Sequence, residues 1–69
     1  MTYKEIAKGI EGRNIPLAGV NENGERIVVG AGITDDGEHY YSITTYQKNG
    51  WARTNNYYED GTVEELYSR

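Results

Sequence analysis

Carboxylates form the most conspicuous group of side chains that could do chemistry. Asp35, Asp36 and Glu38 surround one Asp-Gly pair, and Glu59 and Asp60 precede another glycine. Two carboxylates can act as general acid and base where a cleft separates their pKa values. A chain of 69 residues leaves little room for such a cleft. Acid–base catalysis by these groups is therefore not expected.

Nucleophilic chemistry has equally little support. His39 is the one histidine, and the two serines, Ser42 and Ser68, lie outside any Gly-x-Ser-x-Gly turn. The absence of cysteine excludes a thiol nucleophile, a thiolate zinc site and a disulfide scaffold. Gly30-Ala31-Gly32 lacks the third glycine of a dinucleotide loop and opens no predicted helix. We predict that the protein is not an enzyme and has no cofactor or metal site.

The net charge and the hydropathy of the chain limit the classes of partner that it is expected to bind. Eleven acidic residues against seven Lys and Arg give a net charge of −4, whereas proteins that grip a nucleic-acid backbone carry a basic patch. The longest apolar run, Ile27 to Ile33, is far too short to span a bilayer. We therefore expect a cytoplasmic protein that avoids membranes and does not bind nucleic acid directly.

The first residues predict a short amphipathic helix over about 3–11. Thr2 and Glu5 have the spacing of a capping box. An apolar stripe follows at helical spacing, and Gly12 is a natural end for the helix; the residues of the stripe are Tyr3, Ile6, Ala7 and Ile10.

Four Asx-Gly pairs organise the rest of the chain as hairpins. Asn-Gly and Asp-Gly are the strongest short-range hairpin signals, and the pairs begin at Asn23, Asp36, Asn49 and Asp60. The prediction is one α+β domain over 1–69, with the helix packed on a five-strand antiparallel meander. The predicted strands are about 16–22, 25–35, 38–48, 51–59 and 62–68. The last segment also fits a short helix, and the sheet is either open or curled into a small barrel.

Two-residue turns would fix which side chains share a face of this sheet. Tyr41 would lie opposite Tyr58, with Tyr67 further along the same face. Gly30 and Gly32 would leave a smooth groove on that face beside Ile43. The helix would cover the other face, with Ile6 and Ile10 against Val29 and Ile33. One short helix cannot cover both faces, and an uncovered tyrosine-lined face is typical of an interaction surface.

Turns two and four of a meander lie at one end of the sheet, so their carboxylates should converge there. Three interpretations remain open: ordinary exposed turn residues, electrostatic steering of a basic partner, or a divalent-cation site. The last is the weakest, because Asp35-Asp36-Gly37-Glu38 lacks the ligand spacing of an EF-hand loop.

In size, acidity, tyrosine content and lack of a catalytic set, the chain resembles small phage or mobile-element proteins that inhibit a host machine, anti-CRISPR proteins among them. That resemblance is one of composition and covers no motif. It implies a non-enzymatic inhibitor of a host nucleic-acid-handling machine.

Our leading hypothesis is therefore a protein-interaction module that binds a partner with a basic surface. The predicted contact residues are Tyr41, Tyr58, Tyr67, Asp35, Asp36, Glu38 and Asp60. The alternatives are a homodimeric structural or accessory protein that buries the same tyrosine face, and a single-strand nucleic-acid binder. The latter would stack bases on Tyr46 and Trp51 beside Arg53.

Overall fold

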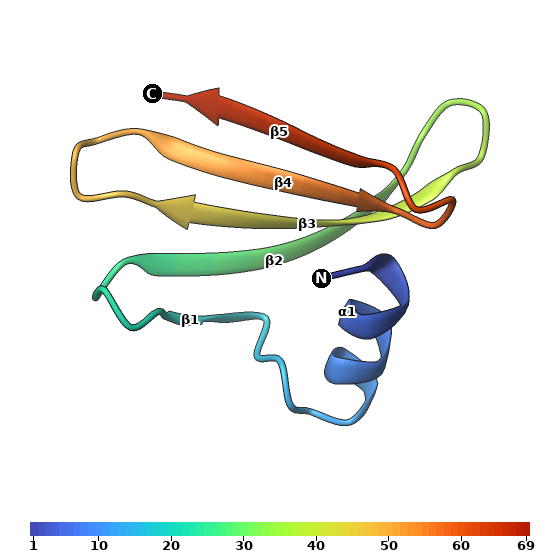
Figure 1. Cartoon of the computed structure of the whole chain (residues 1–69), viewed down its shortest axis with the longest axis horizontal. Helices are drawn as coiled ribbons and strands as arrows, with labels where there is room; N and C mark the ends of the chain where they lie inside the picture. The colour runs from blue at the N-terminus through green and yellow to red at the C-terminus, as the bar shows by residue number, and fades with distance from the viewer.

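The computed structural model describes all 69 residues, as one helix followed by an open five-strand sheet (Figure 1). Each strand is antiparallel to the next, and the strand order in the sheet is the order in the sequence. The α+β meander is confirmed, the last segment is a strand, and the barrel alternative is wrong because β1 and β5 remain at opposite edges. The elements are α1 (Tyr3–Glu11), β1 (Ala18–Val20), β2 (Arg26–Ile33), β3 (His39–Tyr46), β4 (Ala52–Tyr58) and β5 (Val63–Ser68).

Helix α1 occupies the predicted residues. The hydroxyl of Thr2 accepts a hydrogen bond from the Glu5 N–H at 3.2 Å, which caps the first turn. Ile6 is fully buried, and the ring of Tyr3 packs against Tyr41 of β3 with centroids 4.9 Å apart. These contacts attach the helix to one face of the sheet.

The helix ends at Glu11 as predicted, but the left-handed residue that follows it is Arg13 and not the glycine. Gly12 has φ −81°, and the left-handed residue is Arg13 with φ 60°. The Arg13 N–H donates to Ile10 O and the Asn14 N–H to Gly9 O, which is the Schellman pattern. Gly9 has a packing role: a Cβ there would overlap the side chain of Ile15, which lies against the helix.

All four hairpin loops contain three residues instead of the predicted two. In the first, the Asn21 N–H donates to Glu25 O at 2.9 Å and the Gly24 N–H to Asn21 O at 3.0 Å. Of the loop residues only the glycine has positive φ, +81° at Gly24. This is a type I turn followed by a left-handed glycine and a bulge, and the other three turns repeat the same bonds.

One extra residue in each loop shifts the register of the two strands that it joins by one residue. Relative to its neighbour, each strand therefore presents its other set of side chains to a given face. Tyr41 therefore lies opposite Tyr57, and Tyr40 lies opposite Tyr58. The predicted pairing of Tyr41 with Tyr58 is wrong, because Tyr41 lies on the face that carries the helix.

We call the two sides of the sheet the helix-side face and the outer face. Directly paired residues share a face, so the strand pairings assign them. The helix-side face carries Gly19, Ile27, Val29, Ala31, Ile33, His39, Tyr41, Ile43, Thr45, Arg53, Asn55, Tyr57, Val63, Glu65 and Tyr67. The outer face carries Ala18, Val20, Arg26, Val28, Gly30, Gly32, Tyr40, Ser42, Thr44, Tyr46, Ala52, Thr54, Asn56, Tyr58, Glu64, Leu66 and Ser68.

The core is very small. Ile6 and Val29 are the only buried apolar residues, whereas Ile33, the other predicted partner of the helix, is 62% exposed. The accessible surface is 5021 Å², against about 4,400 Å² for a typical folded monomer of 7.8 kDa. The chain therefore leaves exposed a surface that monomers of its size usually bury.

Candidate functional site

The predicted tyrosine cluster is not formed. Tyr41 contacts Tyr3 under the helix. Tyr58 lies on the outer face, where its ring packs on Tyr40 at 5.2 Å and its hydroxyl donates to Glu64. Tyr67 lies on β5 on the helix-side face. The three tyrosines thus occupy both faces and cannot form one binding surface.

The predicted glycine groove is also absent. Gly30 and Gly32 lie on the outer face, whereas Ile43 lies on the helix-side face. A Cβ at Gly32 would overlap the ring of Tyr40, its partner across the strands. The aromatic ring thus covers the space above this glycine.

The residues that were predicted to stack the bases of single-stranded nucleic acid do not share one face either. Tyr46 lies on the outer face opposite Ala52 and stacks with the Arg26 guanidinium, 4.6 Å above its ring. Arg53 lies on the helix-side face between Thr45 and Tyr67. The guanidinium over Trp51 belongs to Arg69, at 4.9 Å.

The predicted acidic end is formed by the β2–β3 and β4–β5 turns, which lie at the same end of the sheet (Figure 1). Burial raises the pKa of Glu38, helped by a hydrogen bond with Asp60 and by the charges of Asp60, Asp36 and Glu59. The backbone N–H of Thr62, 2.8 Å from Asp60 Oδ1, lowers the pKa of Asp60. No three His, Asp or Glu side chains are placed to hold a metal ion. This end presents a concentrated negative charge.

The raised pKa of Glu38, which comes first from burial and then from the neighbouring carboxylates, predicts a pH-dependent stability. A carboxyl with a raised pKa in the folded state favours folding while it is protonated, and that contribution is lost as the pH rises above its ordinary value of 4.5. Glu38→Gln should therefore raise the unfolding midpoint at pH 7. The gain should vanish below pH 4.5, because Glu38 itself is then protonated.

Urea unfolding of both proteins across this pH range provides the measurement. Asp35→Asn is the matched control, because it removes one charge from the same exposed turn and leaves the Glu38–Asp60 pair in place. An equal gain from both variants would mean that general charge, and not the pair, sets the effect. If Glu38→Gln gave no gain in stability at neutral pH, the predicted direction of the effect would be wrong.

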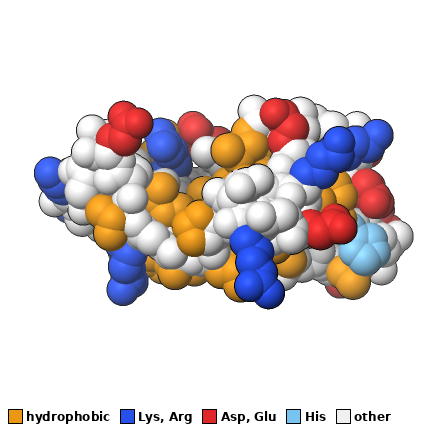
Figure 2. All heavy atoms as spheres, turned by 90° about the horizontal axis from the view of Figure 1, so that it is seen from below, with side chains coloured by type: hydrophobic (Ala, Val, Ile, Leu, Met, Phe, Trp, Pro, Cys, Tyr) orange, Lys and Arg blue, Asp and Glu red, His pale blue; other side chains and the backbone are white.

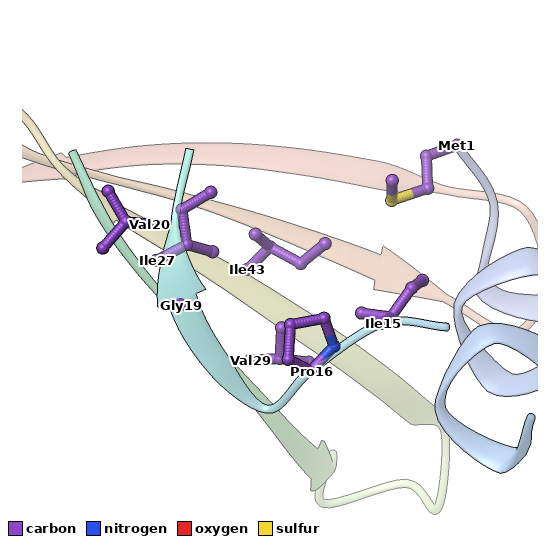
Figure 3. A pocket seen from close by; sticks show the side chains of 8 residues that line it. All are labelled: Met1, Ile15, Pro16, Gly19, Val20, Ile27, Val29 and Ile43. Carbon is purple, nitrogen blue, oxygen red and sulfur yellow. The ribbon is translucent and has the colours of Figure 1, made fainter. Parts of the chain in front are cut away.

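An apolar hollow on the helix side is the most enclosed concave site, and the sequence patterns did not indicate it. Its volume is about 270 Å³. Figure 3 shows the side chains of Ile27 and Ile43 between Val20 on one side and Met1 and Ile15 on the other. Pro16, Gly19 and Val29 complete the lining.

Element lengths explain why the hollow stays open. Nine helical residues span about 13 Å, whereas the eight residues of β2 span about 26 Å. Helix α1 lies near the β3 residue Tyr41, and the end of β2 nearest β1 is left without cover. In the view from the α1 and β1 side, hydrophobic side chains gather along the middle of the molecule with charged groups around them (Figure 2).

The rim of the hollow is exposed to solvent. Val20 is the last residue of the short edge strand β1, so it borders the hollow although its pairing with Arg26 assigns it to the outer face. Its side chain is 69% exposed, and Met1 and the neighbouring Leu17 are similarly open. The walls offer aliphatic carbon and almost no hydrogen-bonding groups, so the site suits an apolar side chain and cannot orient a polar substrate.

Comparison with protein-family models, curated proteins and solved structures finds no match to the chain. Its one helix is neither long nor apolar enough to cross a membrane.

Proposed function

We propose that the chain is a non-enzymatic protein-binding module whose apolar hollow receives an aliphatic or aromatic side chain of a protein partner. The observation that carries this proposal is the hollow itself, open beside the exposed Leu17 and Val20. Buried anchors that fill such pockets supply most of the energy of protein interfaces. At about 270 Å³ the hollow falls just below the range of typical small-molecule sites, about 300–1,000 Å³.

The acidic end gives this module a preference for partners with a basic surface. Concentrated charge speeds association with an oppositely charged protein and disfavours like-charged competitors. A nucleic-acid-handling machine of a host cell offers such a surface. The compositional resemblance to small phage inhibitors favours the same class of partner.

The arrangement of the polar side chains supports a role without catalysis. His39 is exposed at the start of β3 and lies on the helix-side face, whereas Ser42 of the same strand lies on the outer face. The histidine therefore cannot activate this serine. Binding remains as the activity that the geometry favours.

A pair of matched substitutions tests the hollow. Val20→Asp places a charge on its rim, whereas Ile33→Asp places the same charge on a side chain that is 62% exposed and does not line the hollow. The immobilised protein first captures its partner from a cell lysate, and calorimetry then gives the Kd of each variant. We expect Val20→Asp to weaken binding at least tenfold and Ile33→Asp to leave it nearly unchanged.

Circular dichroism of both variants establishes that they remain folded. Normal binding by folded Val20→Asp would exclude the hollow as the contact site. Equal weakening by both variants would point to a general effect of added negative charge.

A further inference from the structure

The two edges of the sheet differ in how they are protected. Edge strands expose unpaired backbone groups, and proteins usually shorten them or add proline, charged side chains or a bulge. Strand β1 has three residues, whereas β5 has six and all six are exposed. Strand β5 has no proline or lysine, and its pairing with β4 runs without a bulge from Val63 to Ser68. Its two charged side chains, Glu64 and Glu65, already accept hydrogen bonds within the copy. The edge is therefore only weakly protected.

We propose that β5 pairs antiparallel with β5 of a second copy of the chain, about a two-fold axis at Leu66. The Tyr58 N–H donates to Thr62 O, so the backbone groups of Thr62 point toward β4. Because inward-pointing and outward-pointing residues alternate along an antiparallel strand, the backbone groups of Val63, Glu65 and Tyr67 point away from β4. In the proposed register Glu65 faces Tyr67 of the second copy, so these outward groups meet and hydrogen-bond. The continuous sheet then has ten strands.

Charge selects this register among the symmetric ones. An axis at Glu65 would place that carboxylate opposite its own copy, and like charges directly opposite are destabilising. An axis at Tyr67 would leave Val63 and Glu64 without partners. With the axis at Leu66, Glu64 faces Ser68 of the second copy, and no acid directly faces another.

Hydrogen bonds within one copy support the same choice. The Glu64 carboxylate already accepts from Asn56 Nδ2 and from the Tyr58 hydroxyl, both at 3.1 Å. The Tyr67 hydroxyl donates to Glu65 along the strand at 3.1 Å. In the proposed register Tyr67 of one copy also lies opposite Glu65 of the other. Leu66, 49% exposed in one copy, would contact Leu66 of the other.

The proposed dimer contact does not involve the hollow, because the hollow lies beside β1 and the contact is made by β5 at the opposite edge of the sheet. In the dimer the two hollows lie toward the outer ends of the extended sheet. The protein would therefore be bivalent, and a partner with two sites would be held by avidity.

Disulfide trapping tests the register directly, since the chain has no cysteine of its own. A non-hydrogen-bonded antiparallel pair has Cα atoms about 4.5 Å apart, within the reach of a disulfide. Leu66→Cys should therefore form a covalent dimer under mild oxidation. Ser68→Cys is the control, because its two copies would lie about 14 Å apart and should remain unlinked.

Sedimentation equilibrium of the unmodified chain supplies the second measurement. We expect the mass of a dimer, and the mass of a monomer for Leu66→Lys, which opposes two ammonium groups on the axis and should stay folded by circular dichroism. A monomer at every concentration for the unmodified chain would overturn the proposal. Equal cross-linking of both cysteine variants would overturn the register. Neither result depends on whether Val20→Asp affects partner binding.

Discussion

Ile6→Ala is expected to destabilise the protein by about 2–5 kcal/mol, the usual cost of removing a buried isoleucine side chain beyond Cβ. Ile6 is the one fully buried large side chain, and only Val29 accompanies it in the apolar core. A chain of 69 residues has a total stability of about 3–10 kcal/mol. The substitution should therefore remove much of that stability and release α1 from the sheet.

Urea unfolding measures the free energy of unfolding, and near-ultraviolet circular dichroism reports the Tyr3–Tyr41 contact that depends on the docked helix. Lys8→Ala is the matched control, since Lys8 is exposed on the same helix. The control should change stability by less than about 0.5 kcal/mol. A loss below about 1 kcal/mol for Ile6→Ala would mean that the helix contributes little to the fold.

The second large effect is expected from the turns. Gly37 and Gly50 have φ +89° and +90°, and no atom lies within 4 Å of the position that a Cβ would take, so alanine there meets backbone strain alone. The left-handed conformation costs an L-residue about 1–2 kcal/mol. The double variant Gly37→Ala/Gly50→Ala should lose about 2–4 kcal/mol, because the two turns lie at opposite ends of the sheet and should act additively.

Asparagine tolerates the left-handed region better than alanine. Gly37→Asn/Gly50→Asn should therefore recover a substantial part of the loss, and urea unfolding of the two double variants gives the comparison. Equal losses from both would contradict the assignment of the cost to the left-handed backbone conformation.

The helix and the hairpins follow from local signals. The Thr2 cap, the apolar stripe and the Asx-Gly pairs each depend on a few neighbouring residues, so α1 and the meander could be predicted from the sequence. The faces could not, because Asn-Gly and Asp-Gly suit both two-residue and three-residue loops. The distinction is whether the residue before glycine also has positive φ, and here it does not.

A signal for the longer loop does exist in the side chains. The Asn49 and Asp60 side-chain oxygens accept from the N–H two residues on, at Trp51 and Thr62. These bonds hold the Asn or Asp residue in its position directly before the left-handed glycine of the three-residue loop. The hollow was missed for a different reason: Ile15-Pro16-Leu17 resembles a connection in sequence, and only packing of Ile15 beside Gly9 makes it a wall.

The most direct test of the proposed binding site uses the six isoleucines of the chain. Their δ1 methyl groups can be isotopically labelled and followed by NMR as the captured partner is added. Ile15, Ile27 and Ile43 line the hollow, whereas Ile6, Ile10 and Ile33 do not. The proposal predicts that the first three signals shift and broaden most strongly. Changes confined to Ile33, or to none of the six while binding proceeds, would contradict it.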